Sequence, residues 1–326
     1  PDLGLWSKFV ASHAQGNIFQ TPFFFRVYQE SNHYRPGVIA VIDEDNRIRG
    51  LLSYQMQQEG SGWMGILSTR SVIMGGPLIT DDDSHVAELL LQAYEKEISS
   101  RVIYSQFRNL FDMEAWKPLF LRNKYRCEDH LNIIIDLTQS EQELWKQVYP
   151  KRRNEIRRAV KEGTSVRLLE GNDEIQEALK ILENVYGRVK LPLAAATVFQ
   201  AASRILAPLG MIRFFGAVNS GRIIGTIVVL CYKNVIYDWY AGSYREHYDK
   251  YPNDILPWEV FLWGRETGYE IFDFGGAGKP GIPYGVRDYK KKYGGSLVNY
   301  SRFIRIHKPL LYQIARTGFS IWQKLQ

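Results

Sequence analysis

The chain has 326 residues, of which 45% are apolar and 23% charged, and its net charge is +6. This length is enough for two domains with separate cores, and the apolar content excludes a disordered chain. Only two cysteines, Cys127 and Cys231, are present, which excludes a disulfide scaffold or a multi-cysteine zinc site. No apolar run approaches the ~18 residues of a membrane span, and residues 1–10 lack the layout of a signal peptide. We therefore expect a cytoplasmic protein.

The charge is unevenly distributed along the chain. Residues 1–139 carry 13 Lys and Arg against 17 Asp and Glu, whereas residues 140–326 carry 28 against 18. An anionic partner, such as a phosphate, a nucleic acid or a membrane surface, is therefore expected at the second part. The alternative is a solvated basic face.

The two parts are predicted to share one plan. Two β-rich runs flank a polar turn over residues 38–54 and again over 213–230, and Arg-Ile-x-Gly follows each turn, at Arg47 and at Arg222. A strand, an amphipathic helix and a second strand are then predicted over residues 66–79, 85–99 and 102–108, and again over 235–242, 255–267 and 269–274. The shared order favours a duplicated unit of mixed α/β class.

A basic helix is predicted to link the two domains over residues 140–163. Ser140 and Glu143 have the spacing of a capping box, and Pro150 is expected to kink or divide the helix. The run Lys151–Lys161 holds six cations and one acid. Further helices are predicted over 173–190 and 197–209, and an amphipathic one over 309–325. The expected domains are residues 1–139 and 140–326.

Several familiar motifs are incomplete. Asp273-Phe-Gly275 lacks the His-Arg-Asp and glycine-rich loops of a kinase. The run Gly275–Pro280 resembles a phosphate-binding loop, but Pro280 stands where Ser or Thr must hold magnesium, and no helix is predicted after it. The histidines show no metal-ligand spacing, and Gly-x-Ser-x-Gly is absent. We therefore expect neither a metal site nor a serine hydrolase.

One segment, residues 269–295, concentrates glycines, lysines and tyrosines. Glycines after a strand let a ligand approach the backbone closely, and lysines can hold phosphates or a developing oxyanion. The alternative is a solvated hairpin tip. The candidate binding residues of this segment are Gly275, Gly276, Tyr289, Lys291, Lys292 and Tyr293.

Phe272-Asp-Phe-Gly-Gly276, followed by Tyr289-Lys-x-x-Tyr-Gly-Gly295, resembles the end of the Fem family of aminoacyl-tRNA-dependent peptidyl transferases. Other stretches resemble landmarks of that family in the same order along the chain. They are Gly16–Pro22, Gly75–Pro77, Lys151–Gly163 with one residue inserted, Tyr237–Ser243 and Pro257-Trp258. The length leaves no room for the helical arm that some members carry, so the chain resembles the short form.

The resemblance implies two tandem GNAT-like domains, each a mixed central sheet flanked by helices, in a monomer. It also implies transfer of an amino acid from aminoacyl-tRNA to an amine of a lipid-linked or nucleotide-linked peptidoglycan precursor. The ester donor is already activated, so no metal or redox cofactor is expected. Lys290 matches the motif lysine and is the first candidate to hold the donor carbonyl or terminal phosphate, although Tyr289 and Tyr293 replace the usual Phe.

Asp273 and Asp238 are the candidate proton acceptors, because they lie on neighbouring predicted strands beside the motif. Each carboxylate has a structural alternative, and a substrate-assisted route needs neither. In the basic helix, the candidates for contact with tRNA phosphates or the acceptor diphosphate are Lys151, Arg152, Arg153 and Arg157. Arg26 is placed near the acceptor diphosphate by the resemblance. Residues 302–326 carry five cations and no acid, which favours peripheral contact with the inner membrane face, or packing on their own domain.

Two other functions remain open. One is a GNAT-type N-acyltransferase with an acyl-thioester donor in exopolysaccharide or lipid biosynthesis. Residues 244–255 lack the Arg/Gln-x-x-Gly-x-Gly/Ala loop that cradles the pyrophosphate of coenzyme A at a helix N-terminus, which counts against that donor. The other is a non-catalytic module that binds tRNA or an envelope lipid.

Overall fold

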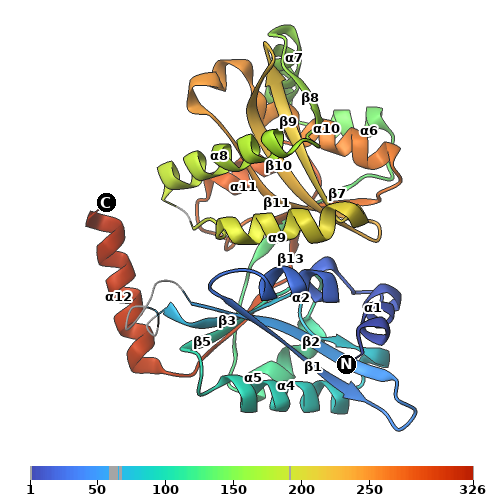
Figure 1. The fold of residues 1–326 in the computed structure, drawn as a ribbon, viewed down its shortest axis with the longest axis vertical. Helices are drawn as coiled ribbons and strands as arrows, with labels where there is room; N and C mark the ends of the chain where they lie inside the picture. Colours follow the sequence, from blue (N-terminus) through green and yellow to red (C-terminus); the bar gives the residue numbers. More distant parts are fainter. Residues whose placement is uncertain (1, 59–64, 66–67, 191, 326) are drawn as a thin grey trace. The chain divides into compact units, whose positions relative to one another are not determined.

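The computed structural model describes residues 2–58, 65, 68–190 and 192–325, and the side chains of 318–325 are left out. The chain forms two compact units. Unit 1 comprises Pro1–Asp129, Gln200–Ile205 and Asn299–Gln326, and unit 2 comprises His130–Phe199 and Leu206–Val298. Each unit has a seven-stranded mixed sheet flanked by helices (Figure 1), which confirms the predicted fold class.

Unit 1 is built on a sheet of order β1-β2-β3-β5-β14-β6, with β4 paired to β2. Its strands are β1 Tyr34–Ile42, β2 Ile48–Gln57, β3 Arg70–Met74, β4 Leu78–Ile79, β5 Tyr104–Arg108, β6 Arg126–Glu128 and β14 Arg302–Ile306. Its helices are α1 Leu3–Ser12, α2 Pro22–Gln29, α4 Ser84–Ile98, α5 Lys117–Arg122 and α12 Pro309–Leu325. A Cβ on Gly50 of β2 would meet Val86 and Leu90 of α4, so this glycine lets α4 pack closely on the sheet.

Unit 2 is built on a sheet of order β13-β7-β12-β11-β10-β9-β8. Its strands are β7 Leu131–Asp136, β8 Ser165–Leu168, β9 Ile212–Asn219, β10 Arg222–Tyr232, β11 Val235–Ser243, β12 Ile271–Gly276 and β13 Ser296–Asn299. Its helices are α6 Glu141–Gln147, α7 Pro150–Lys161, α8 Asn172–Val189, α10 Pro252–Glu266 and α11 Gly285–Lys291, while α9 Ala196–Leu206 has residues in both units.

Helices α8 and α10 cover opposite faces of the unit 2 sheet. Gly242 on β11 pairs with Thr226 on β10, so these two residues share a face, and a Cβ on Gly242 would meet Val185 of α8. The preceding residue, Gly225, points to the other face, where its Cβ would meet Leu256 of α10. The small residues of β10 and β11 thus let both helices approach the sheet.

The duplicated plan is present in both units. In each, an antiparallel hairpin (β1–β2 or β9–β10) is followed by a strand, a helix and a strand parallel to the previous one. These crossover helices are α4 and α10, as expected for connections between parallel strands. Residues 66–67, at the start of one predicted strand, lie outside the described part.

The predicted linking helix is divided at Pro150. Ser140 and Glu143 form the capping box of α6, and Pro150 occupies the first helical position of α7, where its missing N–H costs no hydrogen bond. Gly163, with φ +79°, ends α7. The helix predicted over 309–325 matches α12, and the side chains of its last residues, from 318 on, lie outside the described part.

The two halves of the chain each contribute one strand to the sheet of the other half. In chain order β6 precedes β7 and β13 precedes β14, yet β6 pairs with β14 in unit 1, and β7 lies beside β13 in unit 2. The division of the structure at 129/130 and 298/299 therefore differs from the predicted boundary at 139/140. The reason is that β7 and β14 each complete a backbone ladder in the sheet of the other half. Among the described residues, none of the helices has the length and hydropathy required to cross a membrane.

Candidate active site

The parallel strands β11 and β12 of unit 2 separate partway along their length. They pair only from Val235 with Ile271 to Tyr237 with Asp273. Beyond this point β11 has a bulge at Trp239 relative to β10, and β12 is irregular relative to β7 after Asp273. Bulges redirect side chains and end pairing. The separation leaves carbonyls of β12 available to groups other than β11.

Lys290, on α11, occupies this separation. Its Nζ donates to the carbonyl oxygens of Phe274 at 2.6 Å and Gly276 at 3.0 Å. Burial lowers the pKa of Lys290, and the charges of Asp238 and Asp273 act in the opposite direction. An ammonium group has three donors, so one N–H remains for a ligand.

Asp273 is buried and held from two sides. Its Oδ1 accepts from the Gly275 backbone N–H at 2.7 Å and from Asn132 Nδ2, on β7, at 3.2 Å. Burial raises the pKa of Asp273 to about 6, against the lowering effects of these hydrogen bonds and of Lys290. Gly275 has φ +67°, and a Cβ there would lie 3.0 Å from the Tyr237 hydroxyl. Glycine thus permits the turn that closes on Asp273.

Asp238, on β11, is the second carboxylate at the separation. Burial raises its pKa to about 6, Lys290 lowers it, and Asp273 raises it. Within the described part of the chain, no hydrogen bond engages its side chain. Two carboxylates that titrate near neutral pH beside an ammonium can accept a proton and stabilise a developing negative charge. The three residues predicted to be catalytic therefore lie together.

The structure differs from the expectation that Arg152 and Tyr293 bind substrate. Arg152 is buried and ion-paired with Asp254 of α10, and its guanidinium lies 4.6 Å from the Tyr289 ring centroid and 4.8 Å from that of Tyr293. Tyr293 is 2% exposed. Arg152 and Tyr293 are internal residues, because α7, α10 and α11 meet around them.

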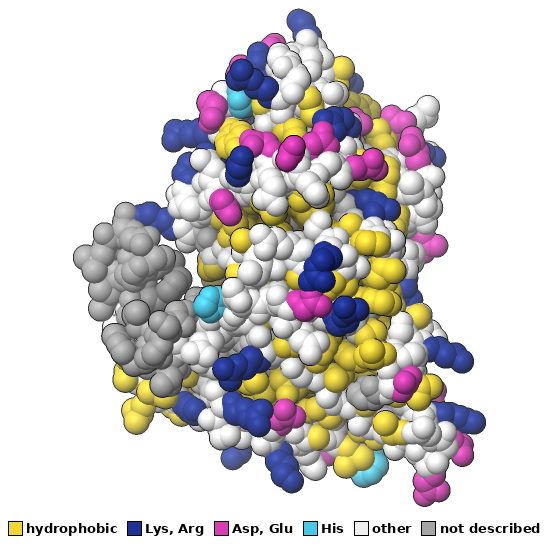
Figure 2. Space-filling view, in the orientation of Figure 1, with side chains coloured by type: hydrophobic (Ala, Val, Ile, Leu, Met, Phe, Trp, Pro, Cys, Tyr) yellow, Lys and Arg dark blue, Asp and Glu magenta, His cyan; other side chains and the backbone are white. Residues whose placement is uncertain are grey.

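The remaining cations of α7 are distributed over its outer faces. Lys151 and Arg153 have no ion-pair partner in the described part of the chain, whereas Arg157 lies 5.2 Å from the Trp145 ring centroid. On the face drawn in Figure 2, Lys and Arg side chains lie among Asp and Glu side chains. Of the four candidate cations of this helix, Lys151 and Arg153 thus have neither an ion pair nor a ring contact in the described part of the chain.

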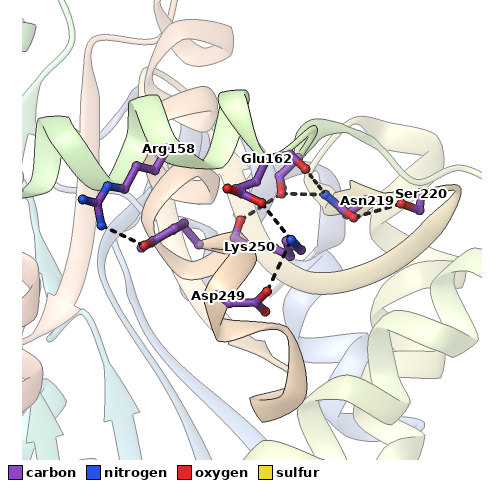
Figure 3. A network of polar contacts seen from close by, with 8 residues as sticks. Arg158, Glu162, Asn219, Ser220, Asp249 and Lys250 are labelled. Carbon is purple, nitrogen blue, oxygen red and sulfur yellow. Dashed lines mark hydrogen bonds and ion pairs between the residues drawn. The ribbon is translucent and has the colours of Figure 1, made fainter.

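The end of α7 is fixed to neighbouring segments by polar contacts (Figure 3). Lys250, the last residue of the 3₁₀ helix η5 (Arg245–Lys250), bridges Glu162 at 2.8 Å and Asp249 at 3.3 Å. Asn219 donates to the Glu162 carbonyl at 2.8 Å. These contacts fix α7 beside the start of α10.

The other predicted binding residues are dispersed. Arg26 belongs to unit 1, on α2, and forms a 3.5 Å ion pair with Glu30. Lys291 is exposed and Lys292 half-buried, and neither has an ion-pair partner among the described residues. The segment containing them is the helix α11 rather than a hairpin tip, and it follows the glycine-rich loop after which no helix was predicted.

Two residues that support the site, and one arrangement that resembles a catalytic triad, were missed by the sequence analysis. Asn132 is the only amide in the apolar strand Leu131–Asp136, and a lone polar residue in a buried strand is a signal for a specific partner. Asp254 is the acid that pairs with Arg152. Unit 1 also contains Ser105, which contacts His307 Nε2 at 2.8 Å, with Glu95 3.7 Å from Nδ1. Ser105 is fully buried, so this arrangement is structural.

Part of the chain resembles known proteins in sequence. Residues 150–291 match the acetyltransferase (GNAT) domain model. A UDP-N-acetylmuramoylpentapeptide-lysine N(6)-alanyltransferase from Weissella viridescens is 25% identical over 153 residues, which cover 46% of this chain and 44% of that protein. The alignment thus spans less than half of that relative.

Two solved structures share the fold over nearly the whole chain. FemX has a TM-score of 0.75 at 14% identity and covers 96% of this chain and 98% of its own. A tandem GNAT protein from the clavulanic acid biosynthesis pathway, solved without AcCoA, has a TM-score of 0.58 at 12% identity, with 94% of each chain covered. The predicted resemblance to Fem-type proteins within the GNAT superfamily is confirmed, and the comparisons support an acyltransferase.

Proposed function

We propose that this chain, which has the tandem GNAT fold of Fem-type transferases, moves an amino acid from aminoacyl-tRNA to an amine of a peptidoglycan or other cell-envelope precursor. The observation that carries this proposal is the convergence of Lys290, Asp238 and Asp273 where β11 and β12 separate. The matched GNAT domain and the alanyltransferase relative support the reaction class.

In the proposed reaction the acceptor amine attacks the ester carbonyl of the donor. A C–N bond forms, the C–O bond to the ribose breaks, the amine loses a proton, and the ribose oxygen gains one. Lys290 directs its third N–H at the oxyanion or at the terminal phosphate of the donor. Asp238 accepts the proton, because its carboxylate is not engaged, whereas Asn132 and Gly275 already donate to Asp273.

The start of α10 favours aminoacyl-tRNA over a coenzyme A thioester as donor. A GNAT-type diphosphate site needs free backbone N–H groups at a helix N-terminus. Here Pro252 lacks that N–H at the first position, and the carboxylate of Asp254 occupies the first turn. That carboxylate is ion-paired with Arg152, so the buried cation beside this terminus is already neutralised and is not available to a diphosphate.

The partners follow from cations in both units. Lys151 and Arg153 of unit 2 are candidates to contact donor or acceptor phosphates, and Arg26 of unit 1 is retained as a candidate for the acceptor diphosphate. A monomer in the cytoplasm would reach a lipid-linked acceptor by peripheral contact at the inner membrane face. Because β14 (302–306) is paired on both sides within the unit 1 sheet, this contact would be made by α12 rather than by the whole of residues 302–326.

The proposal is tested by single-turnover transfer from a pool of radiolabelled aminoacyl-tRNAs to nucleotide-linked muramyl pentapeptide, with radiolabelled acetyl-CoA in parallel. We expect label to move from tRNA to the peptide. This transfer should be lost in Asp238→Asn and retained in Lys291→Met, which changes an exposed lysine. Label transferred only from acetyl-CoA would show that the donor is a thioester and not aminoacyl-tRNA. Salt-sensitive tRNA binding without transfer from either donor, to this acceptor or to its lipid-linked form, would indicate a binding module.

A further inference from the structure

Helix α10 contains a proline in its interior. Pro257 is the sixth residue of the helix Pro252–Glu266, and proline has no backbone N–H to donate. The carbonyl of Asn253, four residues earlier, therefore has no donor at the position where the helix would supply one. This carbonyl lies in the interior of unit 2 and requires a partner from elsewhere.

Two tyrosines of the Lys290 segment supply that partner. The Tyr289 hydroxyl lies 2.5 Å from the Asn253 carbonyl oxygen. The Tyr293 hydroxyl lies 2.9 Å from the same oxygen and 2.9 Å from the carbonyl oxygen of Asp254. Each hydroxyl has one proton, so Tyr289 donates to Asn253, and Tyr293 donates to either carbonyl. Lys290 lies between the two tyrosines in the sequence.

The rings of the same tyrosines are fixed by a cation. The guanidinium of Arg152 lies within 5 Å of both ring centroids, and its ion pair with Asp254 ties it to the first turn of α10. Cation–π contacts strengthen when they are desolvated, as this one is. The hydroxyls and rings of Tyr289 and Tyr293 are thus both held by the first turn of α10. In this turn the Asn253 carbonyl lacks its helical N–H donor because of Pro257.

We propose that Pro257 is a positioning residue, which keeps the Asn253 carbonyl free to hold Tyr289 and Tyr293 and thereby fixes Lys290 where β11 and β12 separate. Lys290's part in transfer rests on the proposed function, but the positioning itself does not.

The test restores the missing donor. Pro257→Ala supplies an N–H that closes on the Asn253 carbonyl and competes with the tyrosine hydroxyls. Pro252→Ala is the matched control, because an N–H at the first helical position has no intrahelical acceptor to compete for. Hydrogen exchange of residues 285–293, and labelling of Lys290 by an amine-reactive reagent with Lys291 as internal reference, need no substrate.

In Pro257→Ala we expect residues 285–293 to exchange at least fivefold faster and Lys290 to label at least fivefold faster relative to Lys291. Pro252→Ala should change either rate less than twofold, and Tyr289→Phe should reproduce part of the Pro257→Ala effect without adding to it in the double variant. Unchanged exchange and labelling in Pro257→Ala would overturn the proposal. If that variant fails to fold, unchanged labelling in Tyr289→Phe/Tyr293→Phe would do so.

In an active preparation, Pro257→Ala should lower kcat by at least tenfold with KM changed less than threefold. If the wild type transfers nothing while the exchange and labelling results are as expected, the proposed function is refuted and the positioning role of Pro257 stands.

Discussion

Asn132 donates from its side chain to the carboxylate of Asp273 at 3.2 Å, and this contact separates the roles of the two aspartates at the site. The Gly275 N–H donates to the same oxygen at 2.7 Å. Asp238 receives no hydrogen bond within the described part of the chain, although burial raises the pKa of both carboxylates to about 6. One carboxylate is thus held in place, and the other is available to a substrate.

The two aspartates should respond differently to the same substitution. Asp238→Asn removes the proton acceptor and should lower the single-turnover rate at pH 7 by about 10²–10⁴-fold. Asp273→Asn removes a charge that raises the pKa of Asp238, so activity should persist and its acidic limb should move below about pH 6. Rate profiles between pH 5 and 8 measure both effects. Activity that survives only in Asp238→Asn would reverse the assignment.

Lys290 should be distinguishable from its lysine neighbours. Lys290→Met removes the donor aimed at the developing charge and should lower the transfer rate by about 10²–10³-fold, in line with the loss of one oxyanion donor. Lys291→Met and Lys292→Met change lysines without an ion-pair partner in the described part of the chain, and they should stay within threefold of wild type. Single-turnover rates at saturating donor check this. Equal losses in all three variants would indicate a diffuse phosphate contact instead.

The buried pair of Arg152 and Asp254 should be costly to break from one side. Arg152→Met leaves the Asp254 carboxylate without its guanidinium partner and should lower the free energy of unfolding by about 3–5 kcal/mol. Arg152→Met/Asp254→Asn removes this stranded charge and should recover part of that loss, because the Glu155 carboxylate, 3.5 Å from the Arg152 guanidinium, also loses its partner. Urea unfolding measures these values, with the exposed Lys151→Met as the control within about 0.5 kcal/mol. Additive losses in the double variant would show that the pair does not interact.

His307 should make unit 1 sensitive to acid. Burial, together with the Arg305 and Lys308 charges, lowers the pKa of His307 from 6.5 to about 4, so folding favours the neutral ring. The stability that this provides is complete above pH 6.5 and is lost as the pH falls from 6.5 through 4. His307→Gln keeps a polar side chain beside Ser105 without this titration.

Between pH 7 and pH 5 the wild type should therefore lose about 1–2 kcal/mol more than His307→Gln. Glu95, whose pKa is raised by burial, lies 3.7 Å from His307 Nδ1, so the same comparison is repeated in a Glu95→Gln background to remove its coupling to the histidine. Urea midpoints at the two pH values provide the measurement. Parallel losses in the two proteins would assign the acid sensitivity to other groups.

Local sequence signals predicted most of the elements. The capping box at Ser140, the break at Pro150 and the two hairpins rest on interactions between residues close in the sequence, and the structure contains all of them. The convergence of Asp238, Asp273 and Lys290 could be predicted because Lys290 matches the motif of the resemblance, and the two aspartates lie on neighbouring predicted strands beside that motif.

The remaining features depend on partners far apart in the sequence. A charge run does not reveal that Arg152 faces Asp254 inside the unit while Lys151 and Arg153 face outward. The hydroxyls of Tyr289 and Tyr293 meet a carbonyl that is free only because Pro257 lies four residues beyond it. The exchange of β7 and β14 is also invisible in a local pattern, since the residues of neither strand indicate which sheet the strand joins.

That exchange has a consequence for synthesis on the ribosome. Domains commonly fold in the order in which they emerge, but β14 lies between β5 and β6 in unit 1 and follows every strand of the unit 2 sheet in the chain. The first sheet therefore keeps an unpaired strand edge on β5 until residues 302–306 have left the exit tunnel. The nascent chain thus exposes an aggregation-prone edge while the whole of the second sheet is being made.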